Sequence, residues 1–226
     1  MMKTKINLVG FEIEGIEDRG SLADSKVITG NGELKSDGSI NTEEEGEDAR
    51  GIEFASRPFA LRSPAIKKVF DEFQDRFYNG IWKFNDSCGF HIHYSFKPRT
   101  APEIFSVGFA RFMLKHIEAE YPDVWSKRRF NSYCSVRDCG AEDVFSWEFG
   151  NVDRYQAINF LPSYRDTKTI EFRIWPADEP RKMEEYLNYT TGLIRKYLAR
   201  PRYKIEGKEY QTEKTELKKR ILKINV

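Results

Sequence analysis

The stretch FHIHY at Phe90–Tyr94 alternates apolar side chains with ionisable ones. The stretches FEIE at Phe11–Glu14 and IEFRI at Ile170–Ile174 repeat that alternation. Because successive side chains of a β-strand point to opposite faces, each stretch would bury one face and present two ionisable groups on the other, roughly 6.6 Å apart along the strand. Three such strands predict one sheet with a face lined by Glu/Glu, His/His and Glu/Arg pairs.

The chain has the length and composition of one large domain. Its 226 residues are 39% hydrophobic and 14% aromatic, which is typical of a packed interior and not of a disordered chain. No apolar run approaches the ~20 residues of a membrane span, and the first residues lack the apolar core of a secretory signal. The three cysteines favour a reducing compartment. We therefore expect a cytoplasmic protein that does not engage a membrane.

Charge is balanced overall but unevenly distributed. The net charge is +1, which excludes a general attraction to nucleic acid. Residues 1–60 carry thirteen acidic and seven basic side chains, whereas residues 195–226 carry eleven basic and four acidic ones. This asymmetry fits two solvated surfaces. It also fits an acidic, metal-binding half beside a basic flank that attracts an anionic substrate.

The remaining patterns predict a mixed order of strands and helices. We expect strands at residues 5–14, 51–55, 82–96, 154–161 and 169–175, the last two as a hairpin, and helices at 64–79, 102–120, from 180 onward and at 212–223. Residues 122–150, which include the basic run Lys127–Arg129, predict only an irregular insertion or a lid. Without a regular βαβ alternation, this order favours an α+β fold with a largely antiparallel sheet.

The ionisable pairs suggest metal chemistry. Hard cations prefer oxygen ligands, so Glu12 and Glu14 could each face a divalent metal, although exposed strands also carry such pairs without a function. His91 and His93 could bind a metal or transfer protons near neutral pH, or they could form a structural pair. The acidic run at residues 43–48 is more typical of a solvated loop.

The third pair suggests phosphate chemistry. A carboxylate beside a fixed guanidinium, as in Glu171 and Arg173, suits a site where metal and phosphate meet, and equally suits a cross-strand ion pair. No phosphate-binding glycine loop or dinucleotide fingerprint is present. A nucleotide site would therefore depend on metals and arginines. The candidate arginines are Arg57, Arg154, Arg165 and Arg173.

The order of motifs resembles the amidoligase family, within the superfamily of glutamine synthetase and glutamate–cysteine ligase. The resemblance covers about residues 6–176, and residues 180–226 fit it less specifically as C-terminal helices of the same domain. Six motifs in order carry it: GFEIE at Gly10–Glu14, DGS at Asp37–Ser39, IEFASRP at Ile52–Pro58, CGFHIH at Cys88–His93, RYxxxN at Arg154–Asn159 and TIEFR at Thr169–Arg173.

This resemblance implies a fold and an activity. The expected fold is a single domain, residues 1–226, with a curved antiparallel sheet of the glutamine-synthetase catalytic type and helices on its outer face. The implied cofactors are ATP and Mg²⁺, with Mn²⁺ as the alternative metal. A carboxylate would attack the γ-phosphate to form an acyl phosphate, and an amine would then displace phosphate to give an amide. Peptides or modified biopolymers, cell-wall precursors, modified nucleobases and small amino acids all remain open as substrates.

The family motifs also imply a metal arrangement. Glu12, His91 and Glu171 resemble the ligands of one metal, and Glu14 and Glu53 resemble ligands of a second. Glutamine synthetase supplies several glutamates for its second metal, and Glu53 is the one clear match among them here. The number of metals, and whether a neighbouring subunit completes the site, therefore stay open.

Further roles follow from the same motifs. Arg173 resembles the arginine that contacts the transferring phosphoryl group or the substrate carboxylate. The resemblance implies catalytic roles for Arg173, Glu53 and Arg154, nucleotide contacts from Arg173, Arg154 and Asn159, and substrate contacts from Asp37, Ser39, Ser56 and His93.

Two other functions fit parts of the sequence. The His-Ile-His stretch at His91–His93 also matches the signature of single-strand DNA nickases, which add a nucleophilic tyrosine, and Tyr186 and Tyr189 lie on a predicted helix downstream. This alternative leaves both glutamate strands unexplained. The other is a non-catalytic binding module that retains the sheet.

Overall fold

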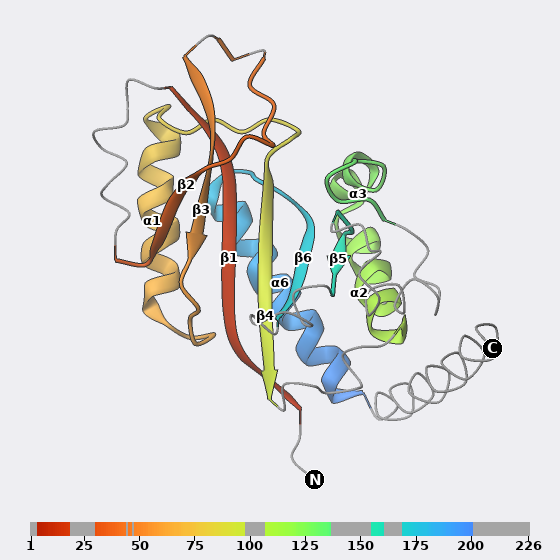
Figure 1. Cartoon of the computed structure of the whole chain (residues 1–226). Helices are drawn as coiled ribbons and strands as arrows, with labels where there is room; N and C mark the ends of the chain where they lie inside the picture. Colours follow the sequence, from red (N-terminus) through yellow and green to blue (C-terminus); the bar gives the residue numbers. More distant parts are fainter. Residues whose placement is uncertain are drawn as a thin grey trace, which may run out of the picture.

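An antiparallel six-stranded sheet and four helices form the described part of the protein (Figure 1). The computed structural model describes residues 4–18, 30–43, 45–46, 48–97, 107–136, 155–160 and 169–200. The strand order across the sheet is β2-β3-β1-β4-β6-β5, and every neighbouring pair is antiparallel. The predicted α+β class and antiparallel sheet are thereby confirmed.

The three alternating stretches occupy adjacent strands at the centre of this sheet. Strand β1 pairs with β3 on one side and with β4 on the other, and β4 pairs with β6. The strand bounds are β1 Lys5–Asp18, β2 Gly32–Ser36, β3 Ala49–Ser56, β4 Gly89–Lys97, β5 Ile158–Asn159 and β6 Thr169–Pro176. One face of these strands is therefore apolar and the other carries the ionisable groups.

The helices cover the apolar face. Phe11 on β1 stacks on Phe70 of the first helix with ring centroids 5.1 Å apart, and Phe172 on β6 meets Phe109 of the second at 6.3 Å. The Tyr94 hydroxyl of β4 donates to a main-chain carbonyl of the last helix, 3.2 Å away. The helix bounds are α1 Pro64–Tyr78, α2 Val107–Glu120, α3 Pro122–Arg128 and α6 Pro180–Ala199.

Local sequence explains where α1 begins and ends. Ser63 is its N-cap and accepts a hydrogen bond from the Ala65 N–H at 3.3 Å, with Pro64 in the first turn. Gly80 follows the helix with φ +69°, a conformation that glycine adopts without strain. Both boundaries agree with the sequence prediction.

Helix α6 has the buried stripe that its sequence predicts. The stripe residues Met183, Leu187, Thr190, Ile194 and Tyr197 are all buried. Because this stripe packs against the apolar face, α6 stabilises the central strands from the side opposite their ionisable groups.

The structure also contains elements that the sequence did not predict. Strand β2, which pairs with β3, is not among the expected strands. Helix α3 lies in the stretch interpreted as an irregular insertion. The start of the 102–120 helix, the hairpin turn and the 212–223 helix lie outside the described residues.

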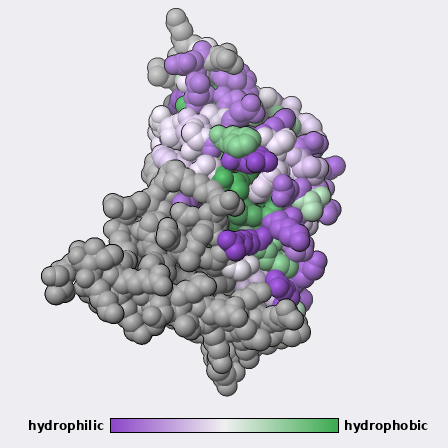
Figure 2. Space-filling model, turned by 90° about the vertical axis from the view of Figure 1, so that its right-hand side faces the viewer, coloured by the Kyte–Doolittle hydropathy of each residue, from purple (hydrophilic) through white to green (hydrophobic). Residues whose placement is uncertain are grey.

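The structure describes part of the protein surface. No helix among these residues combines the length and apolarity needed to cross a membrane. On the flank that faces the viewer in Figure 2, the described side chains are mainly hydrophilic, with smaller hydrophobic areas between them.

Candidate metal and phosphate site

The register of the sheet places the ionisable residues side by side. Glu12 is opposite His91 across β1 and β4, and His93 is opposite Glu171 across β4 and β6. Glu14 is opposite Glu53 of β3. Directly opposed side chains have Cβ atoms about 5 Å apart, so the pairs from separate stretches form one continuous patch.

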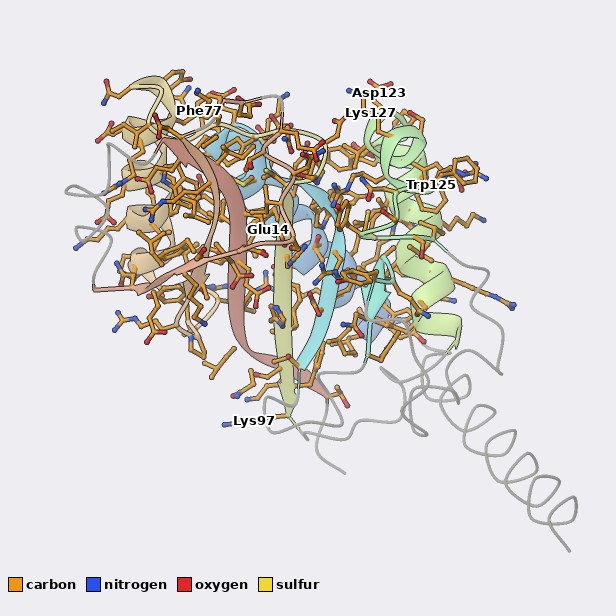
Figure 3. The ribbon with its side chains drawn as sticks, turned by 45° about the horizontal axis from the view of Figure 1, so that its top comes forward. Glu14, Phe77, Lys97, Asp123, Trp125 and Lys127 are labelled. Carbon is orange, nitrogen blue, oxygen red and sulfur yellow. The ribbon has the colours of Figure 1, made fainter. Side chains whose placement is uncertain are left out.

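This patch lines a cavity of about 410 Å³ on the sheet face away from the helices. All six members of the three predicted pairs line it, together with Glu53, Asp37 and Asn159. Figure 3 shows Glu14 near the middle of the sheet beside β4, far from Lys97 at the end of that strand. The predicted convergence of these side chains is therefore present in the structure.

Two groups of donors in the cavity are close enough to share a cation. Glu12, His93 and Glu171 each offer an atom within 4.8 Å of the others, and so do Glu14, Asp37 and Glu53. The carboxylates divide between the groups as the sequence analysis expected. Two details differ from that expectation: His93 takes the place of His91 in the first group, and Asp37 joins the second.

His91 lies between the two groups. Its Nδ1 is 3.2 Å from a Glu12 oxygen and 3.7 Å from a Glu171 oxygen, while its Nε2 is 3.7 Å from a Glu14 oxygen. The side chain is only 2% exposed. The imidazole therefore lies between three carboxylates that would otherwise repel one another.

Glu171 is held by two donors. Arg173 Nη1 donates to one of its oxygens at 2.6 Å, and Asn159 Nδ2 donates to the other at 2.8 Å. Arg173 Nε also donates to the Tyr133 carbonyl at 3.3 Å, and its guanidinium lies 5.6 Å from the Tyr155 ring centre. The arginine is thereby aimed into the cavity from a fixed position.

Glu14 is held by the main chain at the start of β4. The Gly89 N–H donates to its Oε2 at 2.6 Å. A Cβ atom at Gly89 would lie 2.5 Å from His91 Nε2 and 3.0 Å from that same carboxylate oxygen, so only glycine allows this approach. The adjacent Cys88 is fully buried, and burial raises the pKa of its thiol to about 11, which does not suit a nucleophile.

In the group of Glu12, His93 and Glu171, positive charge on histidine can offset the negative charge of the carboxylates. Burial would raise the pKa of Glu12, but its hydrogen bonds with His91 and His93 outweigh burial and hold that pKa well below its ordinary value. Burial would lower the pKa of His93, and the Glu12 and Glu171 carboxylates raise it instead. The two carboxylates therefore favour the protonated form of His93, whose positive charge offsets theirs as a divalent cation would.

The second donor group lacks that balance. Burial, followed by the negative charge of Glu12, raises the pKa of Glu53 to about 7. Lys35 is opposite Glu53 on β2 but is itself exposed. At neutral pH the Glu53 carboxyl is thus partly protonated, as expected where acidic groups gather without a cation between them.

The other predicted contacts are placed differently. Ser39 lies at the cavity but gives its hydroxyl and its N–H to Asp37 Oδ1, at 2.7 and 2.9 Å. Ser56 accepts from the Phe11 N–H at 2.8 Å and lines a neighbouring cavity of about 500 Å³, which also touches Glu12 and His93.

Of the candidate arginines other than Arg173, the structure describes Arg57 alone. Arg57 lies 5.5 Å from the Phe59 ring centre and does not line the site. Arg154 and Arg165 lie outside the described residues.

Sequence reasoning missed several contributors. Gly89 stands within the quoted motif at Cys88–His93, but its close approach depends on the fold. Tyr155 also stands within a quoted motif, at Arg154–Asn159, but received no role, and Lys35 lines the cavity without any distinctive local pattern. Their positions follow from strand pairing, which residue spacing within one stretch does not encode.

The tyrosines required by the nickase alternative lie elsewhere. Tyr186 stacks on Trp175 with ring centroids 4.6 Å apart, and the Tyr189 hydroxyl donates to the His116 carbonyl at 2.8 Å. Both belong to α6, which covers the face opposite His91. Neither tyrosine is therefore positioned to act with the histidine pair.

Comparison of the chain with models of protein families, with curated proteins and with solved structures finds no match. The chemistry of the site must therefore be argued from its own donors.

Proposed function

We propose that this protein is an ATP-dependent carboxylate–amine ligase with a sheet of the glutamine-synthetase catalytic type. A substrate carboxylate oxygen attacks the γ-phosphorus of ATP, the bond to ADP breaks, and an acyl phosphate forms. The amine nitrogen then attacks the acyl carbon, phosphate leaves, and the amine loses a proton as the amide forms. One observation carries the proposal: the three ionisable pairs of separate strands line a single cavity.

The donors of this cavity fit divalent cations. Five carboxylates line it, and those of Glu14, Asp37 and Glu53 form an oxygen-only group that suits Mg²⁺. In the other group the carboxylates of Glu12 and Glu171 suit Mn²⁺ or Mg²⁺, and His93 adds one nitrogen donor. A bound Mg²⁺ would supply charge neutralisation to a triphosphate, which carries the same sign of charge as the cluster.

Side chains of the protein would bind and orient the transferring phosphoryl group. Arg173 is held at 2.6 Å by Glu171 and is therefore oriented before any substrate arrives. From that position its remaining N–H groups would contact an equatorial oxygen of the transferring phosphoryl group, as expected for catalysis by preorganised charge. Asn159 would act indirectly, because its amide fixes the second oxygen of Glu171.

The test is phosphate release in the presence of ATP and Mg²⁺. A panel of carboxylates and amines, supplied separately and in pairs, should give ADP and phosphate only when a matching pair is present. We expect Glu12→Gln to lower turnover at least about 100-fold, since removal of a charged group that positions a catalytic cation costs several kcal/mol.

The matched control is Glu72→Gln. Glu72 is exposed on α1, so the same chemical change there should leave turnover unchanged. Normal turnover by the folded Glu12→Gln variant would reject the metal assignment. Failure to bind ATP and Mg²⁺ by calorimetry would instead favour a non-catalytic binding module.

A further inference from the structure

Arg128, at the C-terminal end of α3, is a buried cation with no carboxylate partner among the described residues. It is 4% exposed. Its Nη1 donates to the Asp86 and Cys88 carbonyls at 3.3 and 3.5 Å, and its Nη2 to the Arg173 and Trp175 carbonyls at 3.3 and 3.5 Å. Four carbonyls satisfy N–H groups but leave the charge unpaired, which is costly in a protein interior unless it serves a purpose.

One of those carbonyls connects Arg128 to the site. The Cys88 carbonyl and the Gly89 N–H belong to the same peptide group. Arg128 donates to the oxygen of this peptide, and the N–H of this peptide donates to Glu14 Oε2 at 2.6 Å. Hydrogen bonds in such a chain polarise one another, so the guanidinium strengthens the N–H that holds the carboxylate.

The second pair of carbonyls fixes the partner strand. Arg173 and Trp175 lie on β6 where its pairing with β4 shifts register, between Phe90 and Ile92. A planar guanidinium that bridges Cys88, the residue before β4, and Arg173 on β6 sets the spacing between the start of β4 and β6. The same side chain therefore acts on the main chain behind both Glu14 and Arg173.

We infer that Arg128 is a positioning residue for the cation site and acts on Glu14 through the Cys88–Gly89 peptide. The inference rests on the proposed function only in that the cavity must bind a divalent cation. A positioning role also predicts whether removal of Arg128 weakens or tightens cation binding. If Arg128 acted only as a nearby positive charge, its removal would tighten cation binding, whereas loss of a positioning contact weakens it.

The guanidinium can be supplied from solution. Arg128 borders a separate cavity of about 680 Å³, which is also lined by Phe77, Asp123 and Lys127. Figure 3 shows Phe77 on one side of the molecule's upper edge, and Asp123 and Lys127 on the other side, at α3. A small cation could reach the space left by a truncated Arg128 through this opening.

The experiment measures Mn²⁺ binding by electron paramagnetic resonance. We expect Arg128→Ala to weaken binding about tenfold or more, in the range typical for residues that orient metal ligands. Guanidinium chloride, well below the concentration that unfolds the protein, should restore most of the loss. Urea, a neutral molecule of similar shape, and NaCl at matched ionic strength should not.

Control variants distinguish failure of the Arg128 inference from failure of the proposed function. Arg129→Ala should bind Mn²⁺ like the wild type, since Arg129 is exposed and lies over the Phe130 ring. Tighter or unchanged binding by Arg128→Ala, or equal rescue by urea, would overturn the inference. If Arg128→Ala does not fold, Arg128→Gln takes its place, and unchanged binding by that variant overturns the inference equally. Absence of Mn²⁺ binding by the wild type would reject the proposed function itself.

Discussion

Phe11 and Glu12 are neighbours on β1, yet they belong to opposite environments. Phe11 is 1% exposed and packs among four aromatic rings, the nearest of which, Phe70, is 5.1 Å away. Glu12 faces two histidines and lies within 4.8 Å of another carboxylate. Contacts on the apolar face stabilise the fold. The ionisable face instead brings like charges together, and their repulsion lowers the stability.

The two faces of the sheet therefore have different roles: the apolar face stabilises the fold and the ionisable face carries the candidate site. Burial of aromatic and aliphatic area against α1, α2 and α6 supplies the stability. This stability allows the other face to keep Glu12 close to Glu171, and Glu14 close to Glu53. Natural proteins accept such local repulsion at sites of function, and a substitution that removes it commonly stabilises the fold while abolishing activity.

The strongest test of this contrast is a pair of adjacent substitutions. Phe11→Ala should lower the free energy of unfolding by about 3–5 kcal/mol, because it leaves a cavity among rings that cannot fully collapse. Glu12→Gln should change it by no more than about 1 kcal/mol, since it removes both an attraction to the histidines and a repulsion from other carboxylates.

Urea unfolding monitored by circular dichroism would measure both variants. Phe130→Ala is the matched control, because Phe130 is 80% exposed and its removal leaves no internal cavity. A loss in Glu12→Gln as large as that in Phe11→Ala would show that the ionisable face is also a source of stability.

The next test concerns the main chain behind the site. We predict that Gly89→Ala weakens Mn²⁺ binding about 10- to 100-fold, because its Cβ would meet His91 Nε2 at 2.5 Å and displace Glu14. Gly192→Ala is the control: no atom lies within 4 Å of its added Cβ, and alanine favours a helix interior. Wild-type affinity in a folded Gly89→Ala variant would mean that the carboxylate does not need this contact.

Much of this contrast could be predicted from spacing within single stretches. Alternation in Phe11–Glu14, Phe90–Tyr94 and Ile170–Ile174 identified which residues share a face, because the period of a strand is a local property. The boundaries of α1 and the stripe of α6 were predictable for the same reason. The carboxylates of Glu12, Glu14 and Glu171 could therefore be assigned to the correct face from local spacing alone.

The arrangement between strands was harder to predict. The choice between His91 and His93 depends on how β4 and β6 align, and their pairing shifts register between Phe90 and Ile92. Asp37 reaches Glu14 only because β2 forms and pairs with β3. Arg128 was visible only as part of a basic run, because its carbonyl partners come from two distant segments. Such contacts depend on tertiary packing, which residue spacing does not encode.

The smallest change in stability should come from Glu53→Gln, and its size should depend on pH. The raised pKa, about 7 against 4.5, means that the metal-free folded protein keeps a proton between these values that the unfolded chain has lost. Stability therefore falls as pH rises through this window. Glu53→Gln removes that loss, which we put at about 1 kcal/mol after allowing for solvent screening of this half-exposed carboxyl.

At pH 8 the metal-free variant should therefore unfold about 2–4 °C above the wild type, and at pH 4 the two should coincide. Thermal unfolding of both proteins in the presence of a chelator measures this directly, with Glu72→Gln as a pH-insensitive control. Saturating Mg²⁺ should reverse the order at pH 8, because the wild type then gains a cation that the variant binds more weakly. An equal difference in unfolding temperature at both pH values would show that neighbouring negative charges on this face do not destabilise the ionised Glu53.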